Sequence, residues 1–188
     1  MFSFNQAGSF GGALYFYVSR ARVKDCRFSN NNATHGGVQG GQGATINFDE
    51  STFSFNSAVR WGGVMDNKLC SNVTITQSHF EKNNVLIREG GVVRAVQDTV
   101  TIVNSTFLSN AALQGKGGAL SGLHSKFTIM SSKFLNNSAA GNGGVLYIIG
   151  ENTELHVLDS SRFVSVQGES RTIFINNSAK DDGAAMYI

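Results

Sequence analysis

The sequence predicts an all-β fold: a right-handed parallel β-helix, or solenoid, of about seven coils with a period of about 27 residues and no helices of note. Two motifs and one pattern predict it. A Phe-x-x-Asn signal alternates in phase with a signal of Gly-Gly or Gly-Ala plus an apolar residue, and short alternating apolar segments lie beside them. The first signal begins seven times in 188 residues, in steps of 26, 25, 27, 27, 27 and 40, at Phe2, Phe28, Phe53, Phe80, Phe107, Phe134 and Phe174.

Short strands are predicted on either side of each signal. Residues 73–76, 100–102 and 127–129 place apolar side chains at every second position, which is typical of a strand with one buried face. Apolar pairs such as Val92-Val93 predict a further strand after the glycines. Each unit therefore carries about three short strands, and each strand pairs with its counterpart roughly 4.8 Å away in the next coil. The lack of a six-residue subrepeat favours the right-handed form.

Residues at equal offsets in such a stack lie above one another, so each repeated residue type predicts a ladder. The phenylalanines predict a buried aromatic ladder of offset-stacked rings. The asparagines predict a second ladder, because their amides bond to copies in adjacent coils and because asparagine tolerates the left-handed conformation of a corner. The ladder asparagines are Asn5, Asn31, Asn56, Asn83, Asn110, Asn137 and Asn177.

The glycine signals predict another corner, where the backbone needs a positive φ or approaches a neighbouring chain closely. They begin at Gly11, Gly36, Gly62, Gly90, Gly117, Gly143 and Gly183. Alanines two residues after a ladder asparagine, such as Ala58 and Ala112, should point into the coil. A small residue two positions before each phenylalanine marks one more column, which contains Cys26, Ser51, Ser78, Ser105, Ser132 and Ser161.

The chain is predicted to be a single β-helix segment spanning residues 1–188, because such a repeat makes one quasi-one-dimensional body. Neither end reads as a cap, so we expect a piece of a longer solenoid. The step of 40 residues from Phe134 to Phe174 predicts an enlarged coil. We expect a strand over 155–163 in that coil, followed by an inserted loop at 164–173 that bulges from one corner.

Composition excludes several classes of partner. The net charge is +2 with both signs scattered, so there is no basic stripe for nucleic acid. No apolar run reaches the roughly 18 residues that a membrane helix needs, so no membrane span is expected in this segment. Cys26 and Cys70 fall at different points of the coil, and we expect two free thiols.

Five Asn-x-Ser/Thr sequons are candidate glycosylation sites. Alternatively, they arise because Asn, Ser and Thr are common in this chain and are favoured at the corners of the coil. They begin at Asn32, Asn72, Asn104, Asn136 and Asn176. Their use would indicate a eukaryotic secreted protein.

The sequence predicts no catalytic, cofactor-binding or metal-binding residue, and no cofactor. β-Helix enzymes that act on polysaccharides need clustered Asp or Glu. Only Asp25 and Glu50 share an offset here, so the 13 acidic residues, including the pair Asp181-Asp182, are expected to be solvated turn residues. One outward, mildly basic column is expected just before the phenylalanines, at Arg27, Thr52, His79, Thr106, Lys133 and Arg162.

The repeat resembles that of the chlamydial polymorphic outer-membrane proteins, which have a right-handed, pectin-lyase-like β-helix superfold. Phe107-Leu-Ser-Asn110 with Gly117-Gly-Ala-Leu120 and Phe2-Ser-Phe-Asn5 with Gly11-Gly-Ala-Leu14 are the nearest copies of the family motif. Several other units carry Val where the family has Ala. In that family the repeats form the exported passenger of an autotransporter and act in adhesion. The resemblance therefore implies a surface-displayed structural or adhesive role.

We therefore expect a non-catalytic, extracellular or cell-surface module, at the outer membrane if bacterial, and not an enzyme. Expected partners are a glycan or a host or cell-surface protein, bound by an exposed face or by the 164–173 loop. Self-association through open β-helix ends is a further expectation, whereas nucleic acid is not expected. Two alternatives remain: the non-catalytic part of a polysaccharide-active, pectate-lyase-like enzyme, and a subunit of an extracellular filament that stacks end to end.

Overall fold

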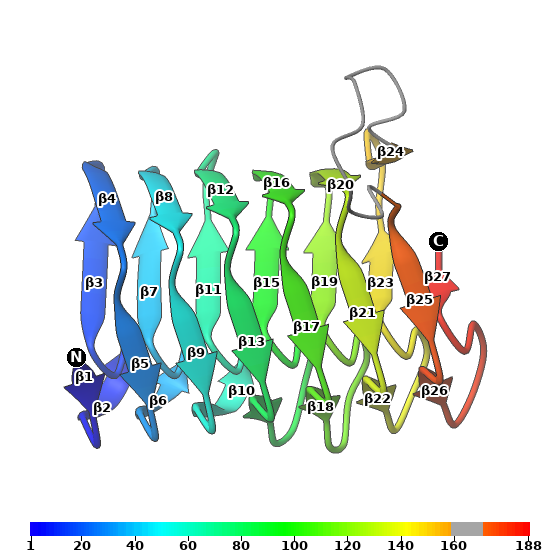
Figure 1. The fold of residues 1–188 in the computed structure, drawn as a ribbon, viewed down its shortest axis with the longest axis horizontal. Helices are drawn as coiled ribbons and strands as arrows, with labels where there is room; N and C mark the ends of the chain where they lie inside the picture. The colour runs from blue at the N-terminus through cyan, green and yellow to red at the C-terminus, as the bar shows by residue number, and fades with distance from the viewer. Residues whose placement is uncertain (159–170) are drawn as a thin grey trace.

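The computed structural model describes residues 1–158 and 171–188, which wind into a right-handed parallel β-solenoid (Figure 1). The predicted fold class is confirmed: three sheets hold seven strands and the fourth holds six, so the chain makes about six turns. The described residues contain no helix. The expectation of three strands per coil is wrong, because each complete coil contributes one strand to each of four sheets, which we name A to D.

Sheets A and B carry the phenylalanines and the inward alanines, respectively. Sheet A consists of β1 (Phe2–Ser3), β5 (Arg27–Ser29), β9 (Thr52–Ser54), β13 (His79–Glu81), β17 (Thr106–Leu108), β21 (Lys133–Leu135) and β25 (Ile173–Ile175). Sheet B consists of β2 (Gln6–Phe10), β6 (Asn32–His35), β10 (Ser57–Trp61), β14 (Asn84–Val85), β18 (Ala111–Ala112), β22 (Ser138–Ala139) and β26 (Ser178–Ala179).

Sheet C follows the glycine signals, and sheet D contains the alternating segments that precede sheet A. Sheet C consists of β3 (Leu14–Tyr17), β7 (Gln39–Gln42), β11 (Met65–Lys68), β15 (Val93–Val96), β19 (Leu120–Leu123), β23 (Leu146–Ile149) and β27 (Met186–Tyr187). Sheet D consists of β4 (Arg20–Lys24), β8 (Thr45–Asp49), β12 (Asn72–Thr76), β16 (Thr99–Val103), β20 (Lys126–Met130) and β24 (Glu154–Leu158).

The enlarged coil is described only in part. The strand expected over 155–163 corresponds to β24, which is described as far as Leu158. The loop expected at 164–173 lies outside the described residues up to 170, and β25 begins at Ile173. β25 then pairs Phe174 with Phe134, so the ladder register is the same on both sides of this region.

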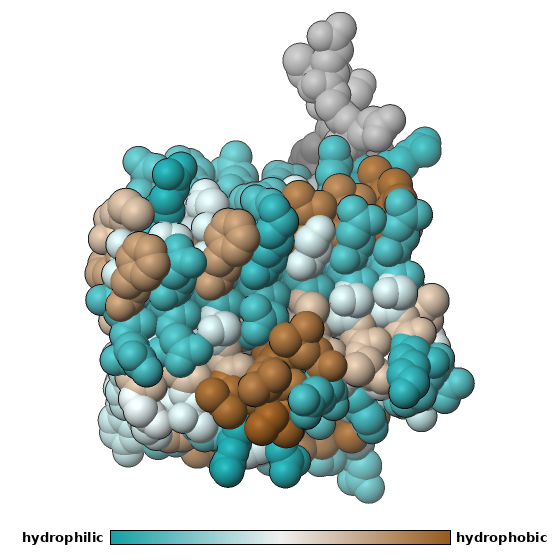
Figure 2. Space-filling view, turned by 90° about the horizontal axis from the view of Figure 1, so that it is seen from below, coloured by the Kyte–Doolittle hydropathy of each residue, from teal (hydrophilic) through white to brown (hydrophobic). Residues whose placement is uncertain are grey.

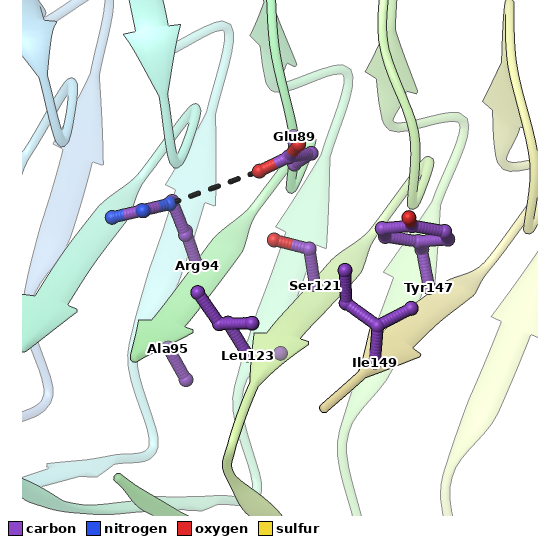
Figure 3. A pocket seen from close by; sticks show the side chains of 8 residues that line it. Glu89, Arg94, Ala95, Ser121, Leu123, Tyr147 and Ile149 are labelled. Atoms are coloured by element: carbon purple, nitrogen blue, oxygen red, sulfur yellow. Dashed lines mark ion pairs between the residues drawn. The ribbon is translucent and has the colours of Figure 1, made fainter. Parts of the chain in front are cut away.

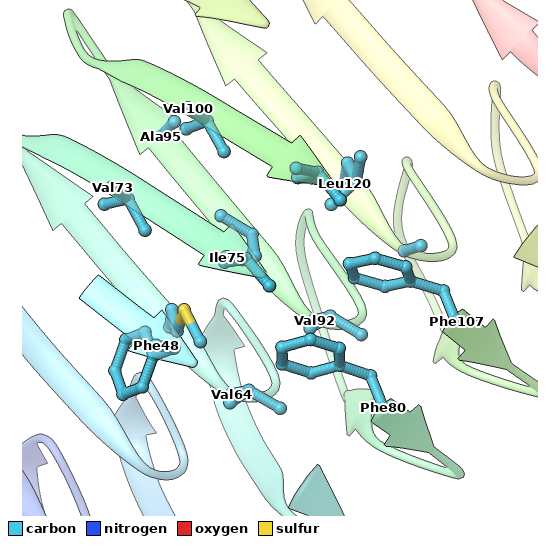
Figure 4. Close-up of a cluster of buried hydrophobic side chains, with 14 of the residues drawn as sticks. Phe48, Val64, Val73, Ile75, Phe80, Val92, Ala95, Val100, Phe107 and Leu120 are labelled. Atoms are coloured by element: carbon cyan, nitrogen blue, oxygen red, sulfur yellow. The ribbon is translucent and has the colours of Figure 1, made fainter. Parts of the chain in front are cut away.

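One column of the core consists of identical residues, phenylalanines, stacked along the solenoid axis. From Phe2 to Phe174 the rings of successive phenylalanines have centroids 4.6–5.1 Å apart and interplanar angles of 3–11°. Figure 4 shows Phe80 and Phe107 in successive coils, with Ile75 and Val92 among the apolar side chains around them. Because parallel strands fix the register, one residue type at one offset is enough to build a continuous aromatic column.

Each corner of the coil is formed by a column of residues with positive φ. Between sheets A and B the column is Phe4, Asn30, Phe55, Lys82, Ser109, Asn136 and Asn176, with φ of 51–56°. Between sheets D and A it is Asp25, Glu50, Gln77, Asn104 and Ser131, with φ of 47–50°. The predicted left-handed role of the ladder asparagines is therefore wrong, because the residue before each of them makes the turn.

The residue that follows each left-handed residue points into the coil. Its side chain accepts a hydrogen bond from the backbone N–H of the equivalent residue in the preceding coil, which has no strand partner. Asn83 Oδ1 accepts hydrogen bonds from both the backbone N–H and the side-chain amide of Asn56, each at 3.0 Å. In the small-residue column, Ser78 Oγ accepts from the Ser51 N–H at 3.1 Å. Such bonds replace the solvent that a buried backbone donor loses. In the last coil Thr172 occupies this column, since its Oγ1 accepts from the Ser132 N–H, whereas Ser161 lies outside the described residues.

The two glycines of each Gly-Gly signal serve different purposes. Gly62 has a φ of 58°, which residues with a side chain rarely adopt. A Cβ on Gly63 would collide with the carbonyl oxygen of Gly91 in the next coil. Both reasons that the sequence suggested for a glycine corner apply, one to each glycine.

Leu69→Asn should stabilise the fold by roughly 0.5–1 kcal/mol, because Leu69 is exposed with a φ of 61° and asparagine tolerates that conformation better. The matched control is Leu113→Asn, which makes the same change at a similar exposure without a positive φ. Urea unfolding of both variants measures the difference. Equal effects at the two positions would contradict the strain argument.

Candidate functional site

Four of the five sequon asparagines lie at the surface. Asn104, Asn136 and Asn176 occupy left-handed corner positions, and Asn72 begins β12. All four are exposed, whereas Asn32 is half-buried and its Nδ2 donates a hydrogen bond to Ser57 Oγ at 2.6 Å. The tolerance of asparagine for the left-handed conformation of a corner thus accounts for three of these asparagines without reference to glycosylation.

Among the residues that the structure describes, the acidic side chains do not converge on one groove. Asp25 and Glu50 are exposed neighbours at the corner between sheets D and A, and Lys24 Nζ lies 3.0 Å from Glu50 Oε1. In residues 1–158 and 171–188, no three His, Cys, Asp or Glu side chains gather as metal ligands would. The expectation that all acids are solvated is wrong for Asp66 and Asp98, which are only 1% and 3% exposed.

The expected basic column lies on sheet A, but one of its members differs. Thr52, His79, Thr106 and Lys133 share one register. β25 pairs Ile173 with Lys133, so Ile173 holds the place expected for Arg162, which lies outside the described residues. The column therefore ends in an apolar side chain and is less basic than the sequence suggested.

An aromatic and cationic cluster covers the corner between sheets B and C. We name it the Trp61 cluster; it contains Phe10, His35, Trp61, Lys68 and Arg94. His35 stacks between Phe10 and Trp61, with ring centroids 4.7 Å away on each side. The Arg94 guanidinium carbon lies 4.6 Å from the Trp61 ring centroid, and Lys68 Nζ lies 5.2 Å from it. These distances fit cation–π contacts.

A buried carboxylate lies beneath the Trp61 cluster. Asp66 Oδ1 accepts a hydrogen bond from Arg94 Nη1 at 2.9 Å, and Oδ2 lies 3.6 Å from Lys68 Nζ. Oδ2 is also 3.9 Å from His35 Nδ1, which is too long for a hydrogen bond. Desolvation lowers the pKa of His35 despite the nearby Asp66 carboxylate, and the nearby cations lower it further, which favours the neutral form of the ring. The arrangement is a packed ion pair under aromatic rings.

A notch opens next to the Trp61 cluster, on the outer face of sheet C (Figure 3). Its volume is about 80 Å³. Glu89 and Arg94 line one side, Tyr147 and Ile149 line the other, and Ser121 and Leu123 lie between them. Glu89 Oε2 is 3.9 Å from Arg94 Nε, and the Tyr147 hydroxyl accepts a hydrogen bond from Lys116 Nζ at 3.1 Å.

A wider groove of about 410 Å³ adjoins the notch and shares Glu89 with it. Ile87, Arg88, Gln114 and Lys116 line this groove at the corner between sheets B and C. The notch combines apolar walls with a few charged groups, which is the usual composition of a binding site, whereas the wide groove is lined mainly by polar and charged side chains.

Sequence reasoning missed this region because its residues come from several coils and differ from coil to coil. Phe10, His35 and Trp61 share one offset, one residue before a glycine signal, but no common residue type marks the column. The available signal was the offset itself: three ring-bearing side chains in consecutive coils. The notch had no signal of that kind, since it forms where a small side chain, Ser121, interrupts a column.

Comparison with known families gives two matches. Residues 2–134 match the model described as right handed beta helix region, and residues 131–149 match the Chlamydia polymorphic membrane protein repeat. Comparisons with curated proteins and with solved structures find no match. Within the described residues there is no helix of the length and hydropathy needed to cross a membrane. The first family match covers well over half of the 188 residues, and its fold is the one observed, so the chain belongs to the right handed beta helix family.

Proposed function

We propose that the chain is a non-catalytic β-helix module, displayed at the cell surface or outside the cell, that acts as a rigid scaffold and adhesive surface. The match of residues 131–149 to a membrane-protein repeat carries the proposal. The same two motifs recur through the other coils, so the whole segment is built like the matched unit.

The distribution of polar groups supports a structural rather than catalytic role. The inward amides and hydroxyls of the ladders are engaged with the backbone, as Asn110 Nδ2 is with Phe80 O at 3.0 Å. Exposed acids such as Asp25 and Asp181 lie on different parts of the coil. The outer face of sheet C and the adjoining corner between sheets B and C, in contrast, have hollows that support binding of a partner.

Protease treatment of intact cells that produce the protein tests the surface location. We expect fragments of this segment to be released while a cytosolic marker stays intact. Beads coated with the purified segment should also bind cell surfaces or a glycan array above the level of albumin-coated beads. Protection of the segment in intact cells, or bead binding at the albumin level, would argue against the proposal.

Purified protein should not cleave a panel of pectins and pectates in the presence of calcium. The expected result is no increase in reducing ends or in unsaturated products over a boiled control. Measurable cleavage would overturn the non-catalytic part of the proposal and favour a polysaccharide-active enzyme.

A further inference from the structure

We propose that the coils of Phe80, Phe107 and Phe134 carry a docking groove for an extended peptide segment of a partner protein. The peptide places one aliphatic side chain in the notch over Ser121 and a second on an exposed aliphatic patch, with an acidic residue between them. This inference rests on the proposed function, because it names the partner class and the surface through which an adhesive module binds.

The notch lies where a small residue interrupts a column of larger, outward-pointing side chains. The second residue of each sheet C strand points outward, and the paired residues are Tyr15, Gly40, Asp66, Arg94, Ser121, Tyr147 and Tyr187. Only Gly40 and Ser121 are small. At Gly40 the chain fills the gap itself, since Phe10 Cβ would lie 2.8 Å from a Cβ built there. Over Ser121 the gap stays open as the notch.

The size and walls of the notch select its occupant. A volume of about 80 Å³ corresponds to roughly two to three liquid waters, which is the room for a branched group of about three or four heavy atoms. Leu123, Ile149 and the ring of Tyr147 provide apolar contact. At the rim, the partly exposed Glu89 carboxylate can accept a hydrogen bond from a peptide N–H. A valine or leucine side chain on an extended backbone meets both conditions.

A second apolar anchor lies on the other side of the wide groove. Leu86, Ile87 and Leu113 are 41%, 43% and 51% exposed, and Val59, at 36%, lies one coil before Leu86 and two coils before Leu113. Backbone bonds from Leu86 to Ala58 and from Leu113 to Val85 hold these residues in register. Figure 2 shows an apolar patch near the middle of this face. Ile87 also lines the groove, so patch, groove and notch are continuous.

The groove between the two anchors favours a negative charge. Arg88 and Lys116 line it, and neither has an acidic side chain within ion-pair distance in the described part of the chain. Arg88 instead packs over Trp61, at 5.5 Å from the ring centroid, and Lys116 bonds to Tyr147. Glu89 is already paired with Arg94, which leaves Asp181 as the one unpaired carboxylate among the lining residues.

A peptide fits this surface better than a glycan does. Two aliphatic anchors separated by a polar groove match the alternating side chains of an extended strand, whose residues advance about 3.3 Å each. A glycan lacks branched aliphatic groups for the notch. The partner is therefore a protein segment with an aliphatic–acidic–aliphatic pattern.

The test uses a synthetic library of labelled eight-residue peptides with leucine near both ends, glutamate in the middle, and serine, threonine or glycine elsewhere. Fluorescence polarisation against the purified chain should identify members that bind saturably. Ser121→Leu, which fills the notch, should weaken their binding at least about tenfold. The matched control is Thr101→Leu, an equivalent polar-to-leucine change on the outer face of sheet D, which should leave binding unchanged. Thermal melts of both variants verify that they fold.

Several outcomes overturn the inference. Equal binding by wild type and folded Ser121→Leu would exclude the notch, and equal binding after both leucines of a peptide are replaced by serine would exclude aliphatic anchors. Dimerisation of the chain that Ser121→Leu abolishes, with no peptide binding, would make a second copy the occupant. Bead adhesion without any peptide binding would reject the groove and leave the proposed function standing. Peptide binding without bead adhesion would support the groove and argue against the proposed function.

Discussion

Phe107→Ala should lower the free energy of unfolding by about 3–5 kcal/mol, the range measured for buried aromatic truncations. Phe107 is fully buried, and its ring lies 4.6 Å from the ring of Phe80 and 4.7 Å from that of Phe134. The substitution leaves a cavity in the middle of the ladder, and parallel pairing on both sides keeps the neighbouring coils from closing it. For a chain of this length the melting temperature should fall by roughly 10 °C.

The matched control is Phe55→Ala, which removes the same side chain from a corner where it is 51% exposed. Its ring contacts Lys82, whose Nζ lies 5.4 Å from the centroid, and it takes no part in the ladder. We expect a loss within about 0.5 kcal/mol for such a surface change. Urea unfolding, followed by circular dichroism, compares the two variants. A Phe107→Ala midpoint equal to that of Phe55→Ala would show that the ladder contributes no more than a surface ring.

The sequence was sufficient for the ladders because they repeat one residue type at one offset. Phe80, Phe107 and Phe134 recur 27 residues apart, and parallel pairing then requires their rings to stack. The strand count was harder to predict. Sheets A and B are separated by one left-handed residue and one buried asparagine, with no glycine or proline to mark the break.

The corner columns show why residue type alone does not predict which residues adopt the left-handed conformation of a turn. The left-handed positions between sheets D and A are held by residues as different as Asp25, Gln77 and Ser131. Their conformation is imposed by the stack, whose backbone hydrogen bonds between coils hold each corner in place whatever the residue type. Asparagine tolerates the left-handed conformation of the turn, but the amides of Asn56 and Asn83 are needed inside the coil to satisfy backbone groups.

The candidate binding surface was beyond the reach of sequence reasoning for a related reason. A groove is defined by differences between coils, whereas the repeat is recognised by what the coils share. Ser121 is unremarkable in the sequence, and becomes important only because Arg94 and Tyr147 stand beside it in the neighbouring coils. The burial of Asp66 and Asp98 is unpredictable for the same reason, since nothing in the neighbouring sequence marks these acids as buried.

Asp98 occupies a ladder position that serine holds in the adjacent coils. It lies between Ser71 and Ser125 in the column that follows the corner between sheets C and D, where Ser125 Oγ accepts from the Asp98 N–H at 3.2 Å. Its own carboxylate accepts from the Ser71 N–H at 2.7 Å and from the Val96 N–H at 3.0 Å. Desolvation outweighs these hydrogen bonds and raises the pKa of Asp98 to about 7 from an ordinary value of 3.8.

The raised pKa makes stability depend on pH in a definite direction. Between about pH 4 and pH 7 the folded chain retains a proton on Asp98 that the unfolded chain has released. Raising the pH through this window therefore favours the unfolded state, and the effect ends above about pH 7, where Asp98 is ionised in both states. A shift of about three units corresponds to a loss on the order of 4 kcal/mol in the free energy of unfolding.

Asp98→Ser should remove this loss and be more stable than wild type at pH 8 by a few kcal/mol, because a hydroxyl repeats the bonding of Ser71 and Ser125 without a buried charge. Asp98→Asn is the second variant, since its amide oxygen still accepts from the Ser71 N–H but does not titrate. Other groups titrate in the same window, so the measured quantity is the difference between wild type and each variant in urea unfolding from pH 4.5 to 8.5. The difference should grow with pH up to about 7 and then level off for both variants. Parallel curves for wild type and the two variants would mean that Asp98 is ionised in the folded chain throughout, with its charge stabilised by the two backbone N–H groups alone.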